Sequence, residues 1–73
     1  MKYIIQYQEI GSTKIIYLQY LYMLYNITSR PGTYIKNHAV KINLSIARYW
    51  LKNYKEDFQT HFPIVKNINI INV

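Results

Sequence analysis

Cysteine is absent from this chain of 73 residues. Neither a disulfide, a thiolate metal ligand nor a thiol nucleophile is therefore available, and the absence fits a reducing, cytoplasmic location. Acidic residues are almost as scarce: Glu9, Glu56 and Asp57 are the full set. The last two are adjacent, so on a helix they would point in different directions and form no catalytic carboxylate pair. We therefore expect a protein that is not an enzyme and has no small-molecule substrate.

Metal and phosphate-binding motifs are also missing. The two histidines, His38 and His61, are far apart in the sequence and have no cysteine to complete a ligand set, so no metal site is expected. Only two glycines occur, and neither belongs to a loop that could cradle phosphates. No cofactor is expected.

Long hydrophobic runs are absent too. The most apolar stretch, residues 15–25, is interrupted only by Gln19. It is about half as long as the roughly 20 residues that a membrane-spanning helix needs. The first residues contain no continuous apolar run of the kind found in a secretory signal. We expect no membrane segment.

Basic residues are plentiful by contrast. Nine Lys and Arg residues against three acidic ones give a formal net charge of +6, which favours polyanionic partners. Most of the basic residues fall between positions 30 and 55, whereas positions 15–29 carry no charge. The positive charge is therefore concentrated in the middle of the chain.

Hydrophobic patterning predicts one domain over residues 1–73, with strands at both ends. Residues 1–10 are rich in β-branched and aromatic types, as in a half-buried strand. Residues 33–35 could add a short strand. Residues 62–65 and 68–73 are β-branched runs separated by Lys66 and Asn67, which predicts a hairpin.

The tyrosine-rich segment over residues 13–27 is expected to form a helix that is apolar on all sides. A domain this small covers such a helix on one side only, so the other side would serve as a dimer interface. Alternatively, its tyrosines line the edge of a monomeric core with their hydroxyls in water. The interface residues expected in the homodimer are Leu18, Leu21, Tyr22 and Tyr25.

Two helices joined by a short turn are expected in the middle of the chain. Ile35, Ala39 and Ile42 have the spacing of one helical face over residues 35–42. A longer helix is expected over about residues 44–58. Its inward face would be formed by Leu44, Ala47, Leu51, Tyr54 and Phe58.

The turn between these helices admits two registers. If Ser45 caps the second helix, Lys52 falls on the buried side. If Asn43 caps it, Ala47 and Trp50 are buried instead. Burying a lysine without a partner is costly, which favours Asn43.

This middle region resembles a known family of DNA-binding proteins. The sequence Pro-Gly-Thr-Tyr-Ile from Pro31, the small residue Ala39 and the Asn-Leu-Ser turn that ends at Ser45 are similar to those of small winged helix-turn-helix regulators. Such regulators are carried by archaeal viruses and plasmids. The resemblance covers Lys14 to Phe58. It implies an α+β winged helix-turn-helix fold of three helices with a small antiparallel sheet, the C-terminal hairpin being the wing.

The resemblance also implies sequence-specific binding of double-stranded DNA by a transcription regulator whose second helix lies in the major groove. Residues one turn apart on that helix would read base edges, and these are Ser45, Arg48, Tyr49 and Lys52. Other basic residues would hold phosphates without reading sequence. They are Arg30, Lys36, Lys41, Lys55 and Lys66.

Two other functions remain open. A protein-protein adaptor could use the same fold and the tyrosine-rich helix over 13–27 without binding DNA. A peripheral membrane or virion-associated protein would bind lipid without binding DNA. The coincidence of the basic residues with the second helix favours DNA binding.

Overall fold

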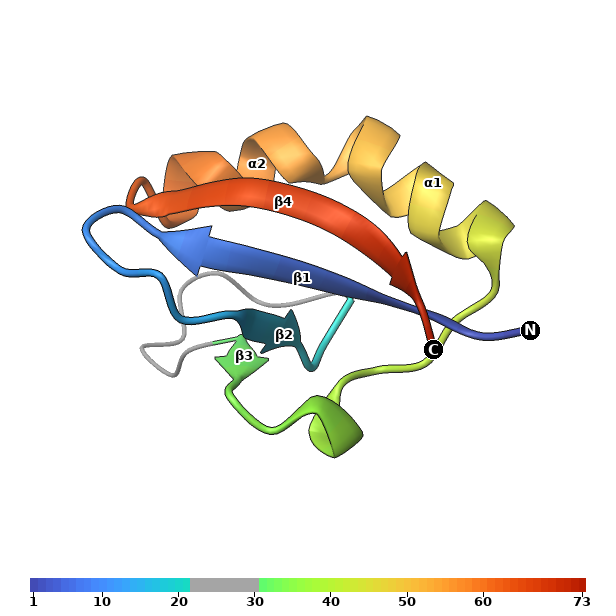
Figure 1. The fold of residues 1–73 in the computed structure, drawn as a ribbon. Helices are drawn as coiled ribbons and strands as arrows, with labels where there is room; N and C mark the ends of the chain where they lie inside the picture. Colours follow the sequence, from blue (N-terminus) through green and yellow to red (C-terminus); the bar gives the residue numbers. More distant parts are fainter. Residues whose placement is uncertain (22–30) are drawn as a thin grey trace.

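The part of the chain that the structure describes forms an antiparallel sheet of four strands with two helices on one face (Figure 1). The computed structural model describes residues 1–21 and 31–73. The strands are β1 (Tyr3–Glu9), β2 (Ile16–Leu18), β3 (Gly32–Thr33) and β4 (Val65–Asn72), in the order β3-β2-β1-β4. The helices are α1 (Leu44–Asn53) and α2 (Lys55–His61), and a 3-10 turn, η1, spans Lys36–His38. The expected α+β class and antiparallel sheet are confirmed.

The strand predicted at residues 1–10 is confirmed as β1, which lies inside the sheet with β2 on one side and β4 on the other. Gly11 turns the chain from β1 towards β2 with a positive φ of 85°, a conformation that glycine adopts without steric cost. The Ser12 N–H donates to the Glu9 carbonyl at 3.0 Å and closes this turn.

The main core lies between the sheet and the two helices. Trp50 and Phe58 are each 1 % exposed, and their rings meet edge to face with centroids 5.5 Å apart. The indole Nε1–H of Trp50 donates to the Leu21 carbonyl at 2.8 Å, so its polar atom is satisfied. The other buried residues of this core are Ile5, Tyr7, Ile16, Leu18, Ile42, Ala47, Val65 and Ile68.

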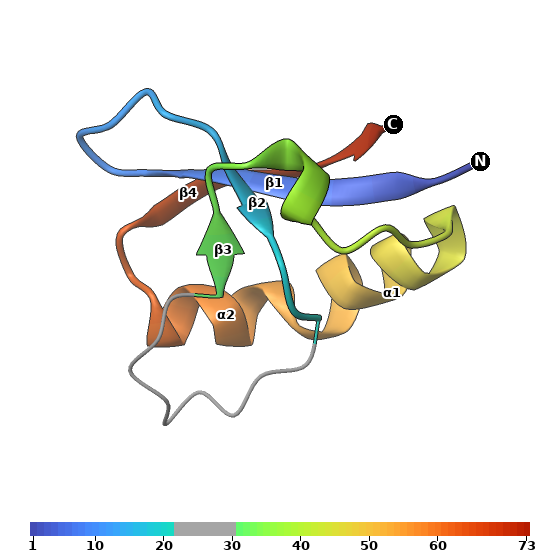
Figure 2. The ribbon, with the colours of Figure 1, turned by 90° about the horizontal axis from the view of Figure 1, so that it is seen from below.

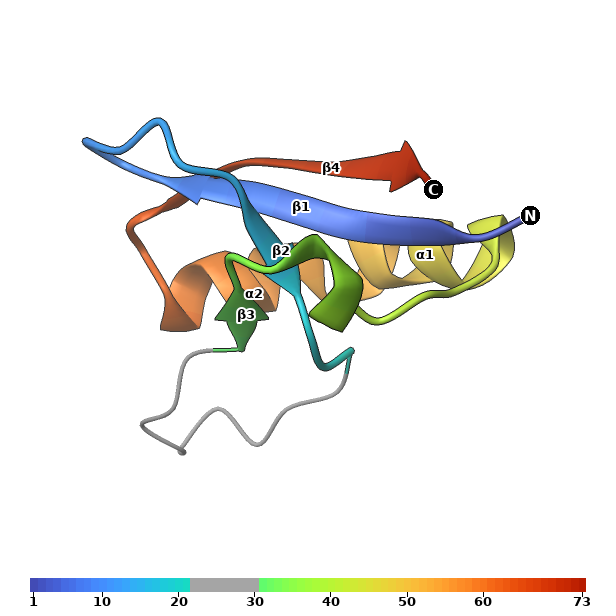
Figure 3. The same cartoon turned by 60° about the horizontal axis from the view of Figure 1, so that its bottom comes forward.

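The opposite face of the sheet is mostly polar and is partly covered by η1. Figures 2 and 3 show η1 over β1 and β2, on the side turned away from α1 and α2. Ile4 alternates with Ile5 and therefore points to this side, where it is fully buried. Farther along β1, the same alternation places Gln6 and Gln8 there, opposite Asn69 and Lys66 of β4, with which they are in register.

The helix expected over residues 13–27 is wrong for its first half, because Ile16–Leu18 forms β2. An unbroken run of apolar residues has no periodicity that separates a strand from a helix. The segment forms a strand because pairing with β1 places Ile16 and Leu18 in the core. Residues 22–27 lie outside the described residues.

The helix expected over residues 35–42 is also wrong beyond its first turn. After η1 the chain is extended: Ala39 has φ −65° and ψ 143°, the Val40 N–H donates to the Leu18 carbonyl, and Ile42 pairs with Tyr3. Ala39 and Ile42 are buried, as their spacing suggested, but on an extended segment. The described residues therefore contain no helix-turn-helix, and the winged helix with three helices is not the fold that they form.

The second helix begins where the sequence predicted, with Asn43 as its cap. The Asn43 side chain accepts from the Ile46 N–H at 2.9 Å, and Ala47 and Trp50 are buried. The helix does not run unbroken to Phe58 as expected. Tyr54, with φ −124° and ψ −12°, separates α1 from α2.

The hairpin expected at the C-terminal end is wrong, because β4 runs straight through Lys66 and Asn67. Between its pairings with Gln6 and Gln8, β4 has one residue more than β1, and Asn67 there has a φ of 54°. An extra residue in one strand makes a bulge that bends the strand without reversing it. No turn forms at Lys66 and Asn67, and there is therefore no wing.

Replacing Asn43 with alanine is expected to lower the free energy of unfolding by about 1 kcal/mol, because the Ile46 N–H loses its acceptor. Urea denaturation followed by circular dichroism measures the change. Asn43→Asp retains the acceptor oxygen and should stay close to the original protein. An equal loss in both variants would contradict the capping role.

Candidate nucleic-acid interface

The outer face of α1 brings together the side chains expected to read bases. Ser45, Arg48, Tyr49 and Lys52 are all exposed and follow one another at helical spacing. They share this face because Ala47 and Trp50 fix the opposite side of α1 against the sheet. We call these four residues the α1 outer face.

The α1 outer face carries uncompensated positive charge. Within α1 there is no acidic residue. In the described part of the chain, neither Arg48 nor Lys52 forms an ion pair with a carboxylate. Both cations therefore remain available to an external anion such as a phosphate.

The polar members of the α1 outer face differ in what they can offer. The Ser45 hydroxyl donates to the Asn43 side-chain oxygen at 2.8 Å, so its proton is used while its lone pairs can still accept. Tyr49 is 54 % exposed, and its ring lies 6.1 Å from that of Tyr54. Tyr49 thus presents a hydroxyl and an aromatic face to solvent.

The residues expected to hold phosphates are divided between two sides of the molecule. Lys41 is exposed on the segment that leads into α1, and its ammonium group lies 3.4 Å from the Asn37 carbonyl. Lys55 is half-buried at the start of α2. Lys36 belongs to η1, which lies on the side of the sheet away from the helices (Figure 3). Lys66 is paired with Gln8 and shares with it the polar face of the sheet. Arg30 lies outside the described residues.

Acidic residues limit how far an anion could extend along the helices. Glu56 and Asp57 are both exposed in the first turn of α2, where carboxylates are favoured by the helix dipole. They would repel phosphates beyond the end of α1. An anionic partner would therefore be confined to α1 and the segment before it.

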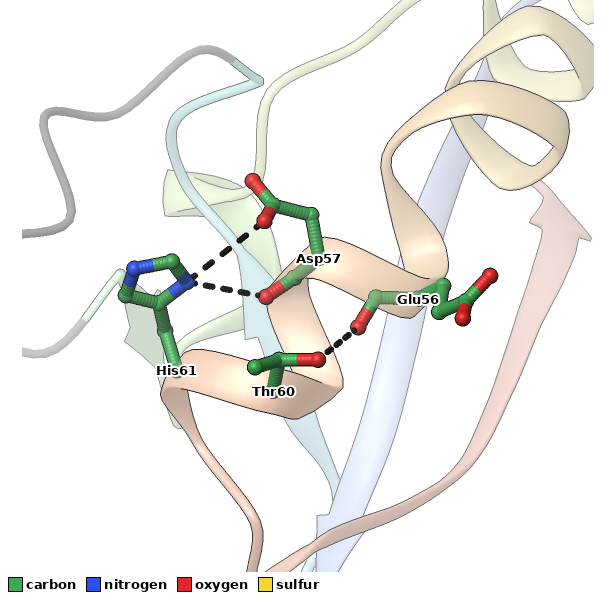
Figure 4. Close-up of polar contacts among 4 residues, drawn as sticks. All are labelled: Glu56, Asp57, Thr60 and His61. Atoms are coloured by element: carbon green, nitrogen blue, oxygen red, sulfur yellow. Dashed lines mark hydrogen bonds and ion pairs between the residues drawn. The ribbon is translucent and has the colours of Figure 1, made fainter.

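The contact between Asp57 and His61 is one that the sequence analysis overlooked, although their spacing of four residues could have revealed it. The His61 Nδ1 lies 3.0 Å from the Asp57 carbonyl and 3.7 Å from its carboxylate (Figure 4). Because a carbonyl only accepts, that shorter contact requires the proton on Nδ1. Beside them, the Thr60 hydroxyl donates to the Glu56 carbonyl. This is a helix-end contact, and the described residues hold no group of three metal-ligating side chains.

The expected dimer interface is altered by the fold. Leu18 is 1 % exposed in the core of its own chain, which corrects its assignment to a surface that meets a partner. Leu21 is half-buried and packs against the same core. Tyr22 and Tyr25 lie outside the described residues.

A surface cavity of about 250 Å³ lies at the C-terminal end of β1, among Tyr7, Glu9, Tyr34 and Phe62. Its volume is below the roughly 300–1,000 Å³ of typical small-molecule sites. Four charged or hydroxyl-bearing side chains converge on the α1 outer face instead, and we take that face as the candidate site.

No protein-family model matches the chain, and neither the curated proteins nor the solved structures give a significant match. Among the described residues, no helix has the length and apolarity needed to cross a bilayer.

Proposed function

We propose that the protein binds double-stranded DNA through the α1 outer face and acts as a sequence-reading transcription regulator. One observation carries this proposal: Arg48 and Lys52 are exposed on one face of a helix, beside Ser45 and Tyr49. Neither cation forms an ion pair among the described residues. A helix packed on a sheet by one side and exposed on the other can enter the major groove with its exposed side. No helix-turn-helix is needed for this.

Each side chain has a distinct role in this proposal. Arg48 donates two hydrogen bonds to a guanine, the commonest specific contact in the major groove. Ser45 accepts from a base amino group, since its own proton is held by Asn43. Lys52 and Lys41 neutralise phosphates at the two ends of the contact. Lys36, in η1, and Lys66, paired with Gln8, do not belong to α1 and take no part.

The adaptor function loses its main support. It relied on a helix over residues 13–27, but Ile16–Leu18 is a core strand. The DNA-binding proposal depends instead on the α1 outer face, whose residues are exposed on one helix. DNA binding is therefore the function that the experiments below test.

Arg48→Ala is expected to weaken binding to a preferred duplex by about 1–3 kcal/mol and to reduce the preference over random DNA. Lys52→Ala should weaken binding to all sequences and lower the salt dependence by about one counterion. Fluorescence anisotropy measures both, using duplexes selected from a random pool and a scrambled competitor. Lys66→Ala removes the same charge from the opposite side of the sheet and is the matched control.

The comparison of these variants decides the proposal. If Lys66→Ala weakens binding as much as Lys52→Ala, the attraction comes from net charge and not from α1. If the unaltered protein binds no duplex at low salt, DNA is not its partner.

A further inference from the structure

The outer edge of β4 is a strand edge with little protection. β4 ends the strand order, and no strand of the described residues pairs with its outer side. Proteins usually guard such edges with charges, prolines or bulges. Here Pro63, Lys66 and the bulge at Asn67 all come before Ile68. Residues 68–73 contain neither a charge nor a proline and are rich in Ile and Val, so this half of the strand is open to pairing.

Backbone hydrogen bonds show which groups of this edge face outward. The N–H and the carbonyl of Tyr3 are both used by Ile42, at 2.7 and 2.9 Å, on the side of β1 away from β4. Asn72 lies opposite Tyr3, so its own N–H and carbonyl point away from β1. Alternation along an antiparallel pair gives Ile70 the same orientation. Val73 alternates with Asn72, and its N–H accordingly points towards β1, where it donates to the Lys2 carbonyl at 3.0 Å.

We propose that this edge binds a second copy of the same chain, antiparallel, about a two-fold axis at Ile71. In this register Ile70 lies opposite Asn72 of the second copy, and the outward N–H and carbonyl groups of both are paired. Ile71 meets Ile71 of the second copy on the face of the sheet that carries Ile4. The two sheets become one continuous sheet, and both pairs of helices stay on the same side.

The chemistry of the segment favours a second copy over another partner. In this register Ile70 meets Asn72 and Asn69 meets Val73, so the paired segment contains no charged side chain. No like charges are brought opposite each other, because Lys66 lies before the bulge and outside the paired segment. The pairing also covers Ile71, which is half-buried in one chain. This dimer does not depend on DNA binding, since α1 is not part of it.

Asn72→Pro and Asn72→Ala form a matched pair that tests the hydrogen bonding. Both substitutions remove the exposed Asn72 side chain, but only proline also removes the outward N–H. Because that N–H makes no hydrogen bond to β1, both variants should fold. Sedimentation velocity over a range of concentrations should show dimers for the original protein and Asn72→Ala and monomers for Asn72→Pro. Added salt should strengthen the dimer, because each copy carries a net charge of +6, whereas it weakens DNA binding.

Single cysteines test the register, since the natural chain has none. Ile71→Cys should form a disulfide-linked dimer under mild oxidation, because non-hydrogen-bonded opposite residues are about 4.5 Å apart. Asn69→Cys and Val73→Cys should each crosslink poorly alone but readily when mixed. Crosslinking of Asn69→Cys alone as fast as Ile71→Cys would overturn the two-fold axis at Ile71.

Amide exchange of the unaltered protein gives a test without substitution. In a dimer the Ile70 and Asn72 amides should exchange slowly at high concentration and faster on dilution, whereas Val73 is protected at both. A protein that stays monomeric at all concentrations, with rapid exchange at Ile70 and Asn72, would overturn the proposal whether or not it binds DNA.

Discussion

Trp50→Ala should lower the free energy of unfolding by about 3–5 kcal/mol, the largest effect that we expect of any substitution here. Trp50 is 1 % exposed and its ring contacts that of Phe58 edge to face. It also ties the segment that follows β2 to α1 through the hydrogen bond from Nε1 to the Leu21 carbonyl. Its loss leaves both a cavity and an acceptor without its partner.

The measurement is urea denaturation monitored by circular dichroism, with the original protein beside it. Such a loss is a large part of the roughly 5–15 kcal/mol that stabilises small domains, so the variant should be partly unfolded at 25 °C. Tyr49→Ala, the adjacent but exposed aromatic residue, should change stability by less than about 1 kcal/mol. Similar losses from the two positions would mean that α1 does not pack as the structure shows.

The burial of Trp50 was foreseeable from the sequence, and so was the α1 outer face. Inside a helix, one set of buried residues fixes the whole orientation, so choosing Asn43 as the cap was enough to expose Arg48 and Lys52. The choice was correct because a lysine without a partner is costly to bury. Local periodicity and one energetic rule thus predicted the side chains that share the candidate site.

The strand pairings could not be predicted in the same way. β2 pairs with β1 across the turn at Gly11, and β4 pairs with β1 from the other end of the chain, but no local pattern in either segment specifies that partner. Ile16 and Leu18 would fit a helix or a strand, and pairing with β1 decided between them. The same limit applies to Lys66, whose place on the far face follows from its register with Gln8.

The winged-helix fold that the resemblance implied was wrong for a related reason. It depended on short local matches such as Ala39 and the turn ending at Ser45, which the structure uses differently. Ala39 is buried after a 3-10 turn on an extended segment, and the Asn-Leu-Ser sequence caps a helix that has no helical partner before it. Small apolar residues and caps are needed in many folds, so they do not specify this one.

Gly32→Ala should lower the free energy of unfolding by about 3 kcal/mol, the second large effect, because β3 passes directly against the core. An added Cβ would overlap the Tyr7 hydroxyl and lie 2.5 Å from the Ile16 side chain. Tyr7 has little room to withdraw, since it is 3 % exposed and its ring packs edge to face on Phe58 at 5.3 Å. The cost is therefore steric.

Gly11 is the control position, because a glycine is favoured there by the backbone conformation and not by a lack of space for a side chain. It has a positive φ of 85°, and nothing lies within 4 Å of an added Cβ. Gly11→Asn, a residue that tolerates positive φ, should therefore be mild, whereas Gly32→Asn should be at least as damaging as Gly32→Ala. Thermal unfolding of the three variants measures this. If Gly32→Ala were as stable as the original protein, β3 could not lie against Tyr7, and the order β3-β2-β1-β4 would have to be revised at that edge.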